Sequence, residues 1–150
     1  MEHLALRAVE AEHRELSQSL IDLQSLVGAD HGEAGPSAWA ARLRGELHHL
    51  RPRLERHFLR EERNFFSRFE ADCPELTPNF QSLAAEHVRL GDEFAAIIDR
   101  ALRPPEETLR EDIGRLLLEF IVRLSMHERR EMAVLAGAVA RGAPGAPASS

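Results

Sequence analysis

The sequence is poor in several residue types, and each shortage narrows what this chain of 150 residues can be. Its single cysteine, Cys73, excludes an internal disulfide and a cysteine-based zinc site, so any bound metal must use nitrogen and oxygen ligands. No apolar run reaches the ~18 residues of a membrane span, and the acidic start of the chain is unlike a signal peptide. We therefore expect a cytoplasmic protein that does not enter a membrane.

Lysine is also absent, so all 19 basic residues are arginines. The formal net charge of −6 argues against nucleic acid as a partner, because proteins that bind phosphate backbones usually present a basic face. The chain does contain 43% hydrophobic residues, enough for the core of one domain, and eight histidines, the commonest protein metal ligand. We expect one domain over residues 1–141 and a small, Pro-rich, disordered tail over residues 142–150.

Apolar residues recur at spacings of three and four in four segments, which predicts an all-α fold. The first helix should end near Val27, and Ser37 is a candidate cap for the second. The second helix should kink at Pro52 or stop just before it, and a clearer break follows at Cys73. The third helix should end before Pro104. Short connections favour an antiparallel up-down-up-down four-helix bundle.

The apolar seams of these helices are interrupted at their centres by histidine and glutamate alone. In each His/Glu pair the spacing is four, which places both side chains one turn apart on the same helix face. The second seam continues through Asn64 and Arg68, with several phenylalanines beside it. The six interrupting residues are His13, His57, Glu61, His87, His127 and Glu131.

A buried set of four imidazoles and two carboxylates needs compensation, since an unpaired buried ion costs several kcal/mol. Metal ions would offset that cost. Six ligands exceed the number that one tetrahedral zinc uses, whereas two bridging carboxylates with terminal imidazoles suit two non-haem iron ions. His3, His48 and His49 lie off the seam and are expected on the surface. We expect packing roles for Trp39 and for Phe58, Phe65, Phe66 and Phe69, and Cys73 lies in a loop where it could be exposed.

Four motifs carry a resemblance: EHREL around His13, HFLREERNFF from His57, AAEHVRL around His87 and HERRE from His127. Together they resemble the hemerythrin-like, HHE cation-binding family from about Glu2 to Val139. The resemblance implies a four-helix bundle with an oxo- or carboxylate-bridged di-iron centre, and its ligand roles fall on the same six residues.

Two departures from oxygen-carrying hemerythrin bear on function. That protein has a second histidine four residues along its third helix, where this chain has Gly91, and its fourth-helix carboxylate lies five residues after the histidine rather than four. Loss of one imidazole should leave an iron with an exchangeable position, which weighs against reversible oxygen carriage. Members of the family that resemble iron-centre repair proteins have a further histidine late in the first helix, a place that His31 could take. We keep His31 out of the site because Gly28 breaks that helical register.

The expected function is binding of O2, NO or peroxide at two iron ions, for sensing, storage or iron handling. An imidazole-rich centre stabilises high-valent oxidation states less well than a carboxylate-rich one, so we expect a binding protein rather than an enzyme. Two alternatives stay open: a di-iron oxidase or peroxidase-like enzyme, and a metal-free helical interaction module. Monomer and homodimer both stay open as well.

Overall fold

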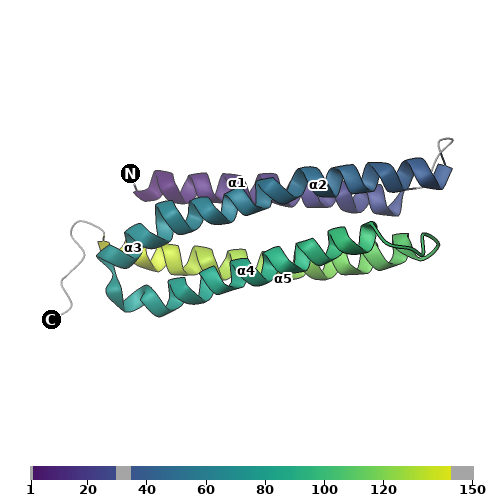
Figure 1. The fold of residues 1–150 in the computed structure, drawn as a ribbon. Helices are drawn as coiled ribbons and strands as arrows, with labels where there is room; N and C mark the ends of the chain where they lie inside the picture. Colours follow the sequence, from purple (N-terminus) through teal and green to yellow (C-terminus); the bar gives the residue numbers. More distant parts are fainter. Residues whose placement is uncertain (1, 30–34, 143–150) are drawn as a thin grey trace.

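The computed structural model describes residues 2–29 and 35–142, and within these ranges the chain is helical and contains no strand (Figure 1). Four long helices make up the bundle: α1 (Glu2–Gly28), α2 (Gly35–Glu61), α4 (Thr77–Ala101) and α5 (Leu109–Gly142). Three short segments join α2 to α4: the π-helix η1 (Glu62–Phe66), α3 (Ser67–Asp72) and the 3-10 helix η2 (Pro74–Leu76). His31, the His3 side chain and all of the predicted tail except Gly142 lie outside the described residues.

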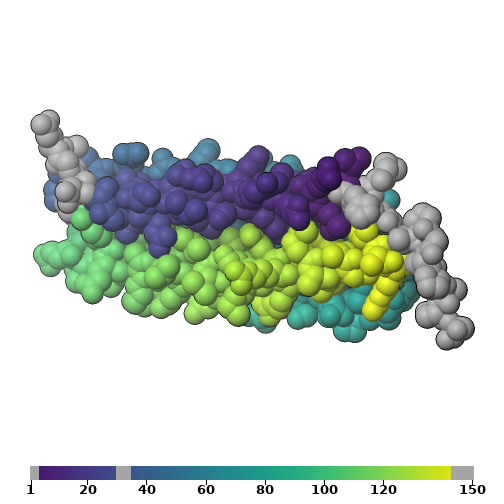
Figure 2. Space-filling view, turned by 180° about the vertical axis from the view of Figure 1, so that it is seen from behind, coloured from purple at the N-terminus to yellow at the C-terminus, as the bar shows by residue number. Residues whose placement is uncertain are grey.

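The long helices form a closed ring of neighbours. α1 packs against α2 and α5, and α4 packs against the same two helices. α1 begins and α5 ends at the same end of the bundle (Figure 1), and these two helices lie side by side on the face seen in Figure 2. The antiparallel up-down-up-down four-helix bundle is therefore confirmed. Among the described helices, none combines the length and the apolar content that a membrane crossing requires.

The core consists of two apolar clusters that follow one another along the bundle axis. On α1, for example, Val9 belongs to one cluster and Leu16 to the other, with His13 between them. The same order repeats on α5, where His127 and Glu131 separate Leu124 from Leu135. A polar layer therefore crosses the whole bundle at one level.

The ends of α2 differ in part from the expectation. α2 begins at Gly35, whose φ of +83° suits a residue without a side chain, so Ser37 lies inside the helix and is not its cap. The alternative that the helix stops near Leu50 is wrong, because α2 continues through Pro52 to Glu61. Burial of Leu50 and Leu54 on either side outweighs the hydrogen bond that proline removes. The buried Trp39 ties this end of α2 to α1, since its indole N–H donates to the Leu26 carbonyl oxygen at 2.9 Å.

Because a π-helical turn follows Glu61, the predicted core-facing residues of the second helix are wrong beyond that point. Asn64 and Arg68 were expected to face the core and are exposed, whereas Phe66 and Phe69 are buried. A π turn holds one more residue than an α turn, so the inward face moves on by one position. Cys73, expected in a loop where it could be exposed, is buried, with its Sγ 3.9 Å from the Ala138 carbonyl oxygen.

Deletion of Asn64 should therefore be tolerated. The shorter segment can close as a regular α-helix that keeps Phe66 and Phe69 in the core, so we expect the free energy of unfolding to change by only about 1 kcal/mol. Deletion of Arg56, which is also exposed, is the matched control. It rotates His57 and Glu61 by ~100° relative to the preceding core residues and should cost several kcal/mol. Urea denaturation followed by circular dichroism measures both, and equal losses would contradict the assigned register.

Candidate metal centre

The six residues predicted from the interrupted seams come together in the polar layer. Among the described residues, the buried polar or charged side chains are these six and Glu86. The most exposed of the six, His13, has 8% of its surface exposed, and Glu131 has none. The layer is thus closed to all but small molecules. His48 and His49 are exposed, as expected.

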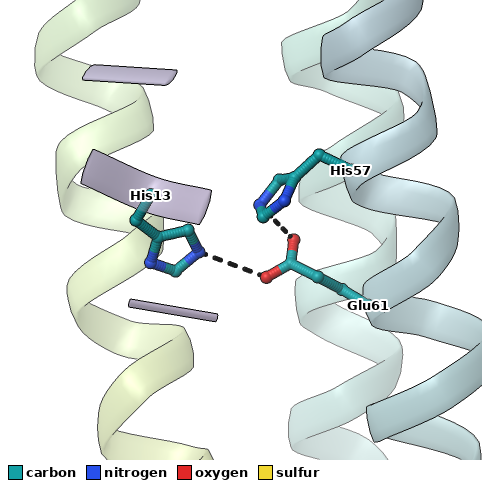
Figure 3. Close-up of side chains that lie close together, drawn as sticks. All are labelled: His13, His57 and Glu61. Carbon is teal, nitrogen blue, oxygen red and sulfur yellow. Dashed lines mark hydrogen bonds and ion pairs between the residues drawn. The ribbon is translucent and has the colours of Figure 1, made fainter. Parts of the chain in front are cut away.

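One triad of ligand-type side chains is formed by α1 and α2 (Figure 3). His57 and Glu61 lie one turn apart on α2, with His57 Nε2 2.9 Å from Glu61 Oε1. His13 approaches from α1 and places its Nε2 3.2 Å from Glu61 Oε2 (Figure 3). The donor atoms of this first triad all lie within 4.8 Å of one another.

The second triad is formed by α4 and α5 from His87, His127 and Glu131, whose donor atoms also lie within 4.8 Å of one another. His127 Nε2 is 3.2 Å from Glu131 Oε2, and His87 Nε2 is 3.6 Å from the same oxygen. It repeats the composition of the first triad, with two imidazoles and one carboxylate.

Both carboxylates reach across to the other triad. Glu131 Oε1 is 3.2 Å from His13 Nε2, and Glu61 Oε1 is 3.4 Å from His87 Nε2. The two triads therefore form one continuous cluster in which each carboxylate faces imidazoles from both halves of the chain.

Three of the histidines turn their second ring nitrogen towards a further glutamate, which we call an outer carboxylate. Glu12 Oε2 lies 2.7 Å from His57 Nδ1, Glu62 Oε2 lies 3.3 Å from His87 Nδ1, and Glu86 Oε2 lies 2.6 Å from His127 Nδ1. An Nδ1–H that donates to a carboxylate leaves the Nε2 lone pair available, and metal-binding histidines are usually oriented in this way. The contacts of Glu12 and Glu86 join neighbouring long helices, and that of Glu62 joins η1 to α4.

Arginines hold two of the outer carboxylates in turn. Arg60 Nη1 is 2.5 Å from Glu12 Oε1, and Arg130 Nη2 is 2.8 Å from Glu86 Oε1. Sequence reasoning missed these partners, although a signal was present. Both halves of the chain contain the dipeptide Glu-His followed by the pattern His-x-x-Arg-Glu, and both use these residues for the same contacts.

Electrostatics in the cluster favour positive charge. Burial lowers the pKa of His13, but hydrogen bonds with Glu131 and Glu61 outweigh it and raise the pKa to about 10. Burial also lowers the pKa of His87, but its hydrogen bonds with Glu131 and Glu61 outweigh this effect and raise the pKa to about 9. Burial raises the pKa of Glu131, yet its hydrogen bonds with His127, His13 and His87 hold that pKa far below its ordinary value. Without a metal, protons thus take the place of cations between the imidazoles and the carboxylates.

The surroundings of the two triads differ. On the side of the second triad, the rings of Phe58 and Phe66 stack on His87, with centroids 4.2 Å and 5.5 Å away. On the side of the first triad, a pocket of about 420 Å³ opens to the surface between α1 and α5 and is lined by His13, Ser125, Glu128, Arg129 and Met132. The aromatic rings therefore cover His87, whereas His13 lines an open pocket. His127 of the second triad also lines a pocket of about 420 Å³, together with Glu86.

The donor set fits metal ions. Buried atoms of Glu61, His87, His127 and Glu131 face one another as imidazole and carboxylate, but among the described residues they do not all form hydrogen bonds of regular geometry. A buried polar atom of this kind is costly unless something else binds it. Ligand atoms at adjacent corners of an octahedron with bonds of ~2.1 Å lie ~3.0 Å apart, and those of a tetrahedron ~3.4 Å. The separations of 2.9–3.6 Å between imidazole and carboxylate atoms match that range.

A sequence model of the family described as the hemerythrin HHE cation binding domain matches residues 4–139. No curated protein and no solved structure matches the chain significantly.

The raised histidine pKa values predict how the stability of the metal-free protein depends on pH. A histidine whose pKa is higher in the folded state stabilises it below pH ~6.5, and this contribution is lost as pH rises through the folded value. Between pH 8 and 10.5 we expect the free energy of unfolding to fall by on the order of 3 kcal/mol. Urea denaturation in chelator at several pH values measures this loss.

His13→Gln should lose much of this pH dependence, whereas His48→Gln, at an exposed position, should keep it. Few other side chains titrate in this alkaline range, because the sequence has neither lysine nor tyrosine. The Cys73 thiol is common to the wild type and both variants. Equal slopes for the wild type and His13→Gln would contradict the coupling of His13 to Glu61 and Glu131.

Proposed function

Since the chain belongs to the hemerythrin HHE cation-binding family, we propose that it is a non-haem di-iron protein that binds a small oxidant, namely O2, NO or peroxide. The observation that carries the proposal is the pair of His/His/Glu triads whose carboxylates each face both halves of the cluster. His13 and His57 would hold one ion, His87 and His127 the other, and Glu61 and Glu131 would be shared between them. Bound iron supplies exchangeable coordination positions and one-electron chemistry.

The charge of the buried layer supports the binding of cations. Glu61 and Glu131 are buried together in a layer that is apolar above and below. In the metal-free protein, protonated histidines balance them. Metal ions would replace those protons and satisfy the unpaired Nε2 and carboxylate atoms at the same time. Nitrogen and carboxylate oxygen together are a donor set that suits iron.

Access to the cluster supports a small ligand. The six residues are at most 8% exposed, and the Phe58 and Phe66 rings cover His87. A diatomic molecule or peroxide could reach such a site, whereas a bulky organic substrate would need the helices to separate. The imidazole-rich ligand set favours binding over oxidative turnover. Sensing, storage and iron handling stay open as uses, and cytoplasmic location and a monomeric or homodimeric state stay predictions.

The first experiment is to measure metal content and the optical spectrum of protein purified without oxygen and then exposed to air. We expect two irons per chain and a new near-ultraviolet or visible band on exposure to air, NO or peroxide. Steady consumption of peroxide or O2 with a reductant would favour the enzyme alternative. A metal-free chain that folds equally well in chelator would refute the di-iron proposal and favour an interaction module.

Replacement of the shared carboxylates should remove metal. Glu61→Ala and Glu131→Ala each delete a ligand proposed to contact both ions, so we expect less than half of the wild-type iron content. His48→Ala and His49→Ala remove exposed imidazoles and should leave it unchanged. Elemental analysis of the four purified variants checks this, with circular dichroism to confirm that each is folded. Equal iron in all four would show that the site lies elsewhere.

A further inference from the structure

We propose that the carboxylate of Glu128 is a seventh ligand of the metal centre, on the side of His13. This inference rests on the proposed di-iron function, and it adds a residue that the six-ligand pattern does not contain. It would make the two metal ions chemically different, because the other side of the centre has no equivalent carboxylate.

The first reason is the state of the Glu128 oxygen. Among the described residues, few buried side-chain atoms lack a hydrogen-bond partner, and most of them belong to the proposed ligands Glu61, His87, His127 and Glu131. Glu128 Oε1 is one of these atoms. The outer carboxylates Glu12, Glu62 and Glu86, by contrast, each contact a histidine Nδ1. By this criterion Glu128 resembles the six proposed metal ligands rather than the outer carboxylates.

The second reason is position. Glu128 precedes Glu131 by three residues on α5, a spacing that places side chains next to each other on a helix face. It lines the pocket that His13 also lines, between α1 and α5. Its carboxylate interacts electrostatically with His13, His57, Glu61 and Glu131. A ligand at this point would approach the first triad from the side of α5, where that triad has no ligand of its own.

The third reason is the contrast with the second triad. Glu128 directly follows His127, and the residue that directly follows His57 in the other half of the chain is Phe58. The Phe58 ring stacks on His87 of the second triad, with the ring centroids 4.2 Å apart. The two halves of the repeated pattern therefore place a carboxylate beside one triad and an aromatic ring beside the other.

The test uses the full chain loaded with cobalt(II), whose visible absorption reports the number and type of its ligands. Glu128→Ala removes the carboxylate and leaves a space open to solvent through the pocket beside His13. Glu119→Ala is the matched control, because Glu119 is an exposed glutamate on the same helix that pairs with Arg115. Each protein is titrated with cobalt and its spectrum is recorded with and without added acetate.

We expect the wild type and Glu119→Ala to bind two cobalt ions with identical spectra that acetate does not change. In Glu128→Ala, one of the two ions should bind at least tenfold more weakly and show an altered spectrum, and acetate should restore the wild-type spectrum by supplying the missing carboxylate. Thermal unfolding of the metal-free variants confirms that each is folded.

Two results would overturn the inference while leaving the di-iron proposal intact. One is a Glu128→Ala spectrum identical to that of the wild type. The other is weaker binding with no response to acetate, which would make Glu128 an outer partner that orients His13. A wild-type chain that binds no cobalt and no iron would refute the di-iron proposal itself, and this inference with it.

Discussion

Four imidazoles and two carboxylates are buried in a layer between two apolar clusters, and the rest of the structure accommodates that charge. α1, α4 and α5 have buried hydrophobic residues above and below the layer, and beyond the end of α2 the segments η1 and α3 supply Phe66 and Phe69. The packing that stabilises the bundle therefore also fixes the level at which the polar side chains meet. The carboxylates cannot reach water and must be balanced within the layer. Protons perform this balance in the metal-free protein, and metal ions would perform it better because they also bind the unpaired Nε2 atoms.

Rigidity of the layer comes from contacts between neighbouring helices rather than within them. The outer carboxylates Glu12, Glu62 and Glu86 each hold a histidine of the adjacent helix, and two of them are held in turn by arginines. Three of the four imidazoles are therefore oriented before any ligand arrives, which lowers the cost of binding. The π-helical turn contributes to this arrangement, because it contains Glu62, which contacts His87, and it also places Phe66 in the core.

The sequence was sufficient to predict the four helices and the six residues of the layer, because both follow from spacings of three and four along single helices. Features that depend on a neighbouring helix could not be predicted in the same way. The contact of Glu12 with His57 joins residues of two helices, and neither residue alone indicates it. The exposure of Asn64 and Arg68 follows from one extra residue in a single turn, which no periodicity reveals. Cys73 is buried because α5 passes beside it, with the Ala138 carbonyl oxygen of α5 close to the Cys73 Sγ. This burial is again a tertiary effect.

The same contacts occur in both halves of the chain: α1 with α2 forms one triad, and α4 with α5 forms the other. Each pair of helices is thus a hairpin that carries half of the cluster, and the chain passes from one hairpin to the other through η1, α3 and η2. If two copies of the chain exchanged hairpins, every contact within the layer would be rebuilt between them. The cluster itself therefore does not distinguish a single chain from a swapped pair, and that choice depends on the geometry of the connection after Asp72.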